Sequence, residues 1–167
     1  MKKIAKFEKV SESIFTEAMV KQNLISENDT STYDDIKLPC RATKGSAGYD
    51  FFAPVDITIP SGYNSIVVPT GIRCKIDEGY MLSMFPRSGL GFKHRVALDN
   101  TVGIIDQDYY FSDNEGHIMI KLHTNLNEPV VIKKGAAFVQ GILLEYHITI
   151  DDEVTETRNG GFGSTSK

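Results

Sequence analysis

Residues 57–76 read ITIPSGYNSIVVPTGIRCKI and contain three short runs rich in β-branched side chains. The runs cover residues 57–60, 65–68 and 72–76, and Ser61-Gly62 separates the first two. β-branched residues are typical of strands, and Ser-Gly is typical of a turn. The segment therefore predicts three short strands in close succession.

The same alternation of short apolar runs and polar turns continues through the chain. It predicts further strands at residues 80–85, 102–105, 117–123, 129–132, 138–146 and 148–150. A helical spacing of apolar residues appears only weakly, at residues 15–24. Many short strands with few helices indicate an all-β sandwich or barrel.

The 167 residues fit one domain. We expect residues 1–157 to form a single β-rich domain, with the polar segment 22–37 as a surface loop. The glycine-rich residues 158–167 are expected to be flexible on composition alone.

Composition and charge narrow the class of protein. The formal net charge is −4, so the surface as a whole does not suit a nucleic-acid polymer, and a small phosphorylated ligand is favoured. No apolar stretch approaches the length of a membrane span. Cys40 and Cys74 lack metal-ligand spacing, and we expect both to be half-buried in a reducing cytoplasm.

The segment FPRSGLGFKHR, residues 85–95, has the residue types of a phosphate site. The guanidinium of Arg87 can bind a phosphate through two hydrogen bonds, and Ser88 and Gly89 add a hydroxyl and an accessible backbone N–H. An ordinary Pro/Gly turn with a solvated basic rim is the alternative.

The segment LDNTVGIIDQDYY, residues 98–110, combines an apolar run with carboxylates. Asp106 follows Ile104 and Ile105 directly and is a candidate general base in a partly dry site. Asn100 can both donate and accept hydrogen bonds, which suits the edge of a nucleobase. A strand followed by an acidic turn, with Asn100 in an Asx turn, remains open.

Three weaker signals complete the set. In GGFGST, residues 160–165, Phe162 can stack on a base while Arg158 neutralises charge, although a disordered end has the same composition. Asp50, after the small residues 45–48, can reach a metal ion through water. Gln140 is polar within an apolar strand and needs a partner if it is buried.

Other common chemistries have no counterpart in the sequence. There is no P-loop, dinucleotide fingerprint or nucleophile elbow. The four histidines lack zinc spacing, and His117 and His123 are predicted to share one face of a strand.

Five segments in this order resemble the five motifs of the trimeric dUTPase family. The segments are residues 47–50, 86–91, 103–109, 135–140 and 158–165, and the similarity spans residues 38–165. The third, GIIDQDY, is the most diagnostic. The resemblance implies a distorted, jelly-roll-like β-sandwich, a cytoplasmic homotrimer with shared active sites, and Mg2+-assisted hydrolysis of dUTP to dUMP and pyrophosphate.

The resemblance also implies roles for single residues. Asp106 would activate the water that attacks the α-phosphorus, and Tyr109 would lie beneath the deoxyribose. Gln140 and Asp50 would act through waters on the phosphates and Mg2+. The remaining substrate-binding residues implied are Arg87, Ser88 and Gly89 for the phosphates, Asn100, Gly103, Ile104, Ile105 and Met119 around uracil in a hairpin, and Arg158, Phe162, Gly163, Ser164 and Thr165 from a neighbouring subunit's tail.

The sequence departs from the family pattern at three places. Only Asn159 separates Arg158 from the Gly-Gly-Phe run, Ala137 stands where the family commonly has arginine, and residues 110–116 form a longer loop after Tyr109. These departures put in doubt the reach of Arg158, any role at position 137 and the outer edge of the hairpin.

Two other functions fit parts of the pattern. A dCTP deaminase shares the fold, but the glutamate-bearing segment of that family has no clear counterpart here. A trimeric module that binds a regulatory protein partner is the second, and the polar segment 22–35 would suit it. The complete motif set favours catalysis.

Overall fold

The computed structural model describes residues 1–29 and 31–156. Its strands are β1 (Ala5–Lys9), β2 (Tyr49–Phe52), β3 (Ile57–Ile59), β4 (Ser65–Pro69), β5 (Ile72–Ile76), β6 (Tyr80–Pro86), β7 (Val96–Leu98), β8 (Gly103–Ile105), β9 (Met119–Thr124), β10 (Val130–Ile132) and β11 (Ala137–Glu145). Its helices are α1 (Glu12–Lys21), α2 (Ser31–Asp34), α3 (Ser88–His94) and the 3-10 helix η1 (Gln107–Phe111).

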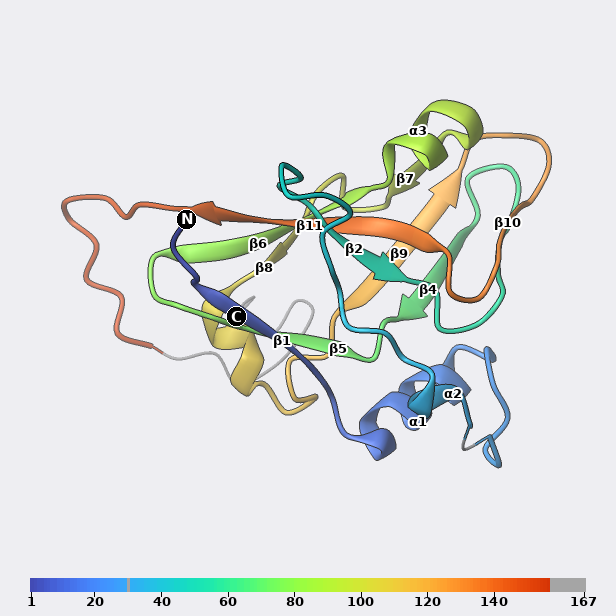
Figure 1. The fold of residues 1–167 in the computed structure, drawn as a ribbon, viewed down its shortest axis with the longest axis horizontal. Helices are drawn as coiled ribbons and strands as arrows, with labels where there is room; N and C mark the ends of the chain where they lie inside the picture. The colour runs from blue at the N-terminus through green and yellow to red at the C-terminus, as the bar shows by residue number, and fades with distance from the viewer. Residues whose placement is uncertain (30, 157–167) are drawn as a thin grey trace.

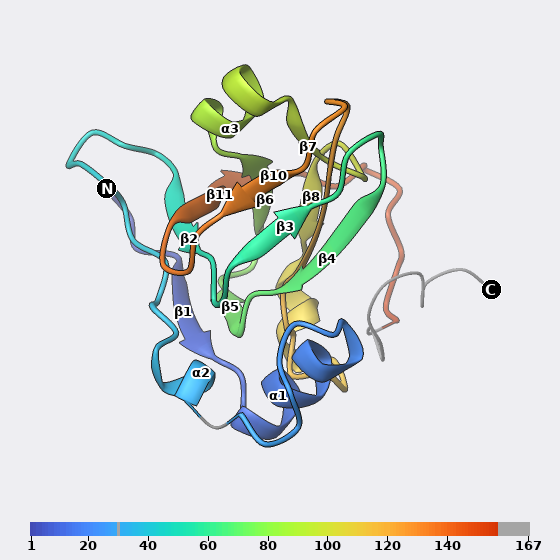
Figure 2. The same cartoon turned by 90° about the vertical axis from the view of Figure 1, so that its right-hand side faces the viewer.

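The strands form small antiparallel sheets that pack together (Figure 1). The largest sheet has the order β2-β11-β6-β8, and the second has the order β4-β9-β7. Two strand pairs, β1-β5 and β10-β3, complete the structure. The helices α1 and α2 lie together at one end, and α3 lies near the opposite end above β7 (Figures 1 and 2). The predicted all-β fold class is confirmed.

The hydrophobic core lies between these sheets. Fully buried side chains come from every sheet, and the largest of them are Phe15, Phe51, Phe138, Met19, Ile57, Ile59, Ile72, Leu82, Met84, Ile118 and Leu122. Burying one such side chain contributes about 1.5–3 kcal/mol, so this core dominates the stability of the domain.

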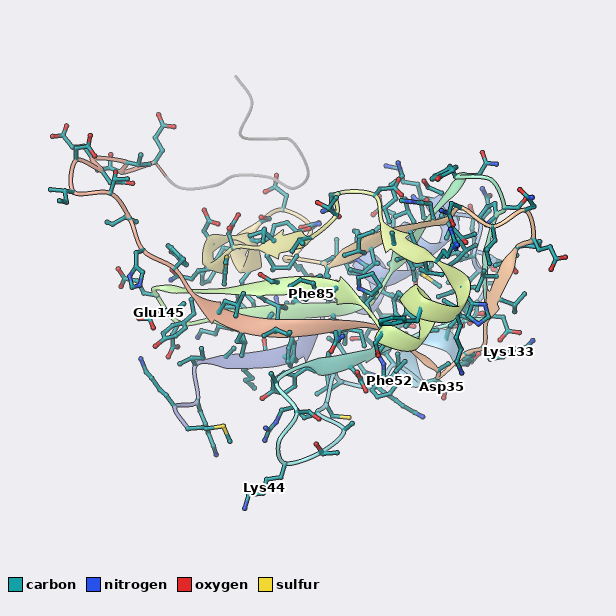
Figure 3. All side chains as sticks on the ribbon, turned by 90° about the horizontal axis from the view of Figure 1, so that it is seen from above. Asp35, Lys44, Phe52, Phe85, Lys133 and Glu145 are labelled. Carbon is teal, nitrogen blue, oxygen red and sulfur yellow. The ribbon has the colours of Figure 1, made fainter. Side chains whose placement is uncertain are left out.

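The pairing of β6 with β11 is the longest strand contact and runs from Val139↔Pro86 to Glu145↔Tyr80. On its other edge β11 pairs with β2, so that Gln140 lies between Phe85 of β6 and Asp50 of β2. Figure 3 shows Glu145 at the far end of β11 and Phe85 further along the strand pair. The register brings three of the predicted motifs to one place.

The first 37 residues form part of the folded domain. β1 pairs with β5, and α1 buries Phe15 and Met19. The segment 22–37, predicted as a polar surface loop, contains α2 and the buried side chains of Thr32 and Ile36. Its polar residues act locally, since the Asp29 carboxylate accepts hydrogen bonds from the backbone N–H groups of Ser31 and Thr32 at 3.0 Å.

The prediction of a strand at residues 148–150 is wrong. Residues 146–156 are exposed along their whole length and run away from the sheets (Figure 1). A strand needs a neighbour to complete its hydrogen bonds, and within the described part of the chain none pairs with this segment. Its apolar residues, Ile148 and Ile150, therefore remain on the surface.

His117 and His123 do not share a face, contrary to prediction, because β9 begins only at Met119. His117 lies before the strand, is buried, and accepts a hydrogen bond from the backbone N–H of Gly71 at 2.9 Å. His123 lies on β9 and contacts Asp99. The prediction that both cysteines are half-buried is also wrong, since Cys40 is exposed and Cys74 is fully buried.

We predict that acidification from pH 7 to pH 5 destabilises the domain through His117. Burial lowers the pKa of His117 from 6.5 to about 4, so below pH 6.5 the unfolded chain takes up a proton that the folded domain does not. This contribution to stability is complete above pH 6.5 and is lost as the pH falls toward 4, and the loss reaches about 2 kcal/mol at pH 5.

Urea unfolding at pH 7 and pH 5 checks this prediction in the wild type and in His117→Gln. The variant should lose less stability on acidification than the wild type, by about 2 kcal/mol. His147→Gln, at an exposed position, serves as the control and should behave as the wild type. An equal loss in the wild type and in His117→Gln would contradict the prediction.

Candidate active site

The connection from β7 to β8 passes from one sheet to the other, since β7 pairs with β9 and β8 pairs with β6. The predicted hairpin is therefore a corner between sheets. The backbone N–H of Thr101 donates to the carbonyl of Leu98 at 3.0 Å, and Thr101 has a φ of 62°. This left-handed conformation is uncommon for threonine and turns the chain at Asn100.

A pocket of about 170 Å³ opens beside this corner. It is lined by Met84, Leu98, Asp99, Asn100, Gly103, Ile104, Ile105, Met119, Ile120 and Lys121. The structure thus brings together five residues that the sequence predicted around a base: Asn100, Gly103, Ile104, Ile105 and Met119. Asp99 and Lys121 were missed. The position of Asp99 directly before Asn100 was the available signal.

Gly103 keeps this pocket open at its floor. A β-carbon at position 103 would lie 3.1 Å from the β-carbon of Met84 and 3.8 Å from Nδ2 of Asn100. The absent side chain therefore leaves the Asn100 amide accessible next to the backbone of β8. Since β8 is at the edge of its sheet, one side of its backbone is available to pair with a ligand.

Asp106 and Tyr109 follow β8 directly. Asp106 occupies the residue before η1, and its carbonyl accepts a hydrogen bond from Tyr109 N–H at 3.2 Å. The Asp106 side chain is partly buried, and Tyr109 is only 4% exposed. The Tyr109 hydroxyl donates to the carbonyl of His117 and accepts from the Asn114 amide, both at 2.8 Å. Neither residue lines the pocket itself.

A second group of predicted residues gathers where β2, β11 and β6 meet. The Arg87 guanidinium forms an ion pair with the Asp50 carboxylate. Gln140 lies opposite Asp50 in the register, and its Nε2 donates to the carbonyl of Pro86 at 3.4 Å. A β-carbon at Gly48 would lie 2.4 Å from Oε1 of Gln140, so the glycine gives the amide its space.

Ser88 and Gly89 are the first residues of α3, a helix that the sequence did not predict. Arg87 is the residue before this helix. An open cleft of about 300 Å³ is lined here by Pro86, Arg87, Ser88, Gly91 and Phe92. The Phe92 side chain is 91% exposed beside it. The Arg87 guanidinium and the Ser88 hydroxyl therefore belong to residues that line one cleft, at the segment predicted to bind phosphate.

The two groups share no lining residue, although β6 connects them. Met84 lines the pocket and Arg87 follows three positions later, which is about 10 Å along a strand. Arg158, Phe162, Gly163, Ser164 and Thr165 lie outside the described residues.

The described residues include no cluster of three or more metal-ligating side chains. Asp50, the predicted metal contact, is engaged by Arg87. One carboxylate next to the predicted phosphate segment fits Mg2+, which usually keeps several waters and is bound by one or two carboxylates together with ligand phosphates. Among the described helices none has the length and apolar character of a membrane span.

Comparison with known proteins places this geometry in a family. The family model described as dUTPase matches residues 34–166. This chain belongs to the dUTPase family. It is 40% identical to the deoxyuridine 5'-triphosphate nucleotidohydrolase of Lactococcus lactis over 133 residues, which cover 78% of this chain and 88% of that protein.

Solved structures of dUTPases have the same fold. The crystal structure of the dUTPase from Streptococcus mutans aligns with a TM-score of 0.64 at 30% identity, over 86% of this chain and 97% of that chain. A mutant dUTPase from phage phi11 of S. aureus aligns with a TM-score of 0.62 at 18% identity, over 92% and 98% of the two chains. That phage protein coordinates a structural Mg(II) ion.

We predict that the Arg87–Asp50 pair in this dUTPase family member stabilises the fold as well as shaping the site. The Asp50 side chain is 14% exposed, so loss of its partner leaves a largely buried carboxylate uncompensated. A double-mutant cycle with Arg87→Met and Asp50→Asn, followed by urea unfolding, should give a coupling of about 1 kcal/mol.

The exposed Lys133–Asp56 pair is the matched control, and its coupling should be smaller than that of Arg87 with Asp50, because solvent screens both of its charges. Equal couplings for the two pairs would show that Arg87 and Asp50 gain nothing from their partial burial.

Proposed function

We propose that this protein hydrolyses dUTP to dUMP and pyrophosphate, which lowers cytoplasmic dUTP, limits uracil in DNA and supplies dUMP for dTMP synthesis. The observation that carries the proposal is the pocket in which Asn100, β8 and Met119 meet, in a chain of the dUTPase family. Relatives named for this activity, such as the Lactococcus lactis protein, support it.

Uracil is the base that the pocket suits. The free edge of β8 offers backbone donors and acceptors, and the Asn100 amide offers one of each. Cytosine has a donor where uracil has the O4 acceptor and an acceptor where uracil has the N3–H donor, so it would leave buried polar groups unpaired, which costs on the order of 10^4-fold in a well-formed site. Thymine differs by one methyl group and would be rejected by steric contact with the apolar wall.

Asp106 acts as the general base. It accepts a proton from a water molecule whose oxygen attacks the α-phosphorus, the bond from this phosphorus to the bridging oxygen breaks, and pyrophosphate leaves with the electron pair. Asp106 directly follows Ile105, the last residue of β8. This position supports the role of Asp106, because the strand holds its carboxylate next to the pocket that positions the uracil ring. Tyr109 lies beneath the deoxyribose and restricts space for a 2′-hydroxyl.

The cleft at the start of α3 holds the triphosphate. Arg87 neutralises charge, Ser88 and Gly89 donate hydrogen bonds, and Gln140 and Asp50 orient waters around the phosphates. Mg2+ held mainly by the phosphates would supply further charge neutralisation. These side chains position the chain of phosphates for attack in line with the leaving group.

We further propose a homotrimer in which neighbouring copies share each site. The separation of the base pocket from the Asp50–Arg87 group in one chain supports this arrangement. The exposed residues 146–156 carry the apolar side chains of Ile148, Ile150 and Val154, which a second copy would bury. The tail residues Arg158 and Phe162 to Thr165 would then close the site of a neighbour.

A substrate panel tests the proposed activity. Pyrophosphate release is measured from dUTP, dCTP, dTTP and UTP with Mg2+, together with ammonia release from dCTP. Turnover should be confined to dUTP. Ammonia release would support the deaminase, and a folded protein that binds dUTP without turning it over would support the regulatory module.

We predict that Asp106→Asn lowers kcat for dUTP by about 10^2–10^4-fold, because the amide keeps the shape of the carboxylate but cannot accept the proton. The Kd for a non-hydrolysable dUTP analogue should change by less than about three-fold. Steady-state kinetics and isothermal titration calorimetry provide the two values. A kcat within about five-fold of wild type would remove Asp106 from the mechanism.

Deletion of residues 158–167 should lower kcat/KM for dUTP by at least about ten-fold, because the tail would no longer exclude water from the triphosphate. The melting temperature should be unchanged, since the buried core of the described residues extends from Val10 to Val139 and precedes this segment. Kinetics and thermal unfolding of the truncated protein test both statements, and unchanged kinetics would rule out a role for the tail.

A further inference from the structure

We propose that Asp99 is a positioning residue that fixes the distance between the two walls of the base pocket and thereby sets affinity for the pyrimidine base. The inference rests on the proposed function and extends it to a residue outside the predicted set. Asp99 lies immediately before Asn100, and both line the pocket.

Asp99 connects the corner between β7 and β8 to two other strands. Its carboxylate accepts a hydrogen bond from the Ser65 hydroxyl of β4 at 2.7 Å. The Nδ1 of His123, on β9, lies 2.7 Å from the other carboxylate oxygen, and the Nζ of Lys121 lies 3.0 Å from the first. Asp99 N–H also donates to the Lys121 carbonyl at 3.1 Å. Both the side chain and the backbone of Asp99 are thus held by neighbouring strands.

These contacts hold the residue before Asn100 against the sheet that carries the β9 wall of the pocket, since Ser65, Lys121 and His123 all belong to the β4-β9-β7 sheet. Asn100, Ile104 and Ile105 form the wall on the β8 side, whereas Met119 and Lys121 form the wall on the β9 side. The two strands belong to different sheets, so no ladder of backbone hydrogen bonds joins them. In the described chain, Asp99 forms the polar link between the corner and β9 closest to Asn100.

The corner needs such a link because its backbone is not in a favourable conformation. Thr101, two residues after Asp99, has a φ of 62°, and a threonine in this region is stable only where its surroundings hold it. The chain turns here between strands of only three residues each. Loss of the Asp99 contacts would therefore let Asn100 move relative to Met119.

The electrostatic environment agrees with this geometry. Burial alone would raise the pKa of the Asp99 carboxyl, but the hydrogen bonds from Ser65, His123 and Lys121 outweigh burial and hold the pKa below its usual value. Asp99 is therefore charged at neutral pH and its contacts are charge-assisted, which makes them stronger than neutral hydrogen bonds.

The test uses deoxyuridine as a competitive inhibitor, because a nucleoside without phosphates reports on the base pocket and not on charge near the triphosphate. Asp99→Asn should raise the Ki of deoxyuridine and the KM for dUTP about five-fold, with kcat within about two-fold of wild type. Ser65→Ala, which changes no charge, should raise Ki about two-fold, and it should add little in the Asp99→Asn background.

Asp56→Asn is the matched control. The Asp56 carboxylate also accepts hydrogen bonds, from the Lys133 ammonium at 2.7 Å and from the backbone N–H of Lys134 at 2.8 Å. Asp56 lies outside the pocket. It should leave Ki and KM unchanged. A purely structural role for Asp99 would instead lower the melting temperature and the fraction of active protein without changing Ki.

An unchanged Ki in Asp99→Asn and in Ser65→Ala would overturn the proposal, and so would independent effects that simply add in the double variant. If Asp99→Asn does not fold, the Ki of Ser65→Ala alone tests the proposal, because this substitution removes one hydrogen bond to Asp99 at an exposed residue. Failure of the proposed function is distinguishable, because the wild-type protein would then show no turnover of dUTP to inhibit.

Discussion

The antiparallel pairing of β6 with β11 is the constraint on which the rest of the structure depends. It fixes Gln140 between Phe85 and Asp50, and the strand that it holds carries Met84 to the base pocket and leads directly into Arg87. Because side chains alternate along a strand, a shift of one residue in this register would move every one of these groups to the other face. Both halves of the candidate site therefore depend on one set of backbone hydrogen bonds, and the large buried core on either side of the sheet specifies that set.

The connection between β7 and β8 shows how the fold creates a pocket where two sheets meet. Had β7 and β8 paired with each other, their backbone groups would have been satisfied within a hairpin. Instead each strand pairs with a different sheet, and β8 keeps one edge available to a ligand. The contacts of Asp99 with β4 and β9 hold the start of the corner against the β4-β9-β7 sheet, directly before Asn100. The proposed recognition of a base by backbone groups and the proposed role of Asp99 both depend on this topology.

The sequence predicted the fold class and half of the residues that line the pocket, since strand periodicity and the order of the motifs are local properties. It failed where tertiary contacts decide. The residues 148–150 have the composition of a strand but have no partner in the described chain, and the polar residues around Asp29 cap a short helix that composition alone did not indicate. Asp99 was overlooked because its importance comes from Ser65 and His123, which are distant in sequence. The ion pair of Arg87 with Asp50 could not be predicted for the same reason.

The central claim is that the base pocket of one copy works with the Asp50–Arg87 group of another, and subunit mixing tests it most directly. Asp106→Asn and Arg87→Met proteins, each nearly inactive alone, are mixed in equal amounts under conditions of subunit exchange, and native mass spectrometry verifies the mixed trimers. If each site joins two copies, about a quarter of sites have both intact parts, so about a quarter of wild-type pyrophosphate release should return. Activity no higher than the mean of the two parent proteins, in verified mixed trimers, would place both parts of the site in a single chain and contradict the account.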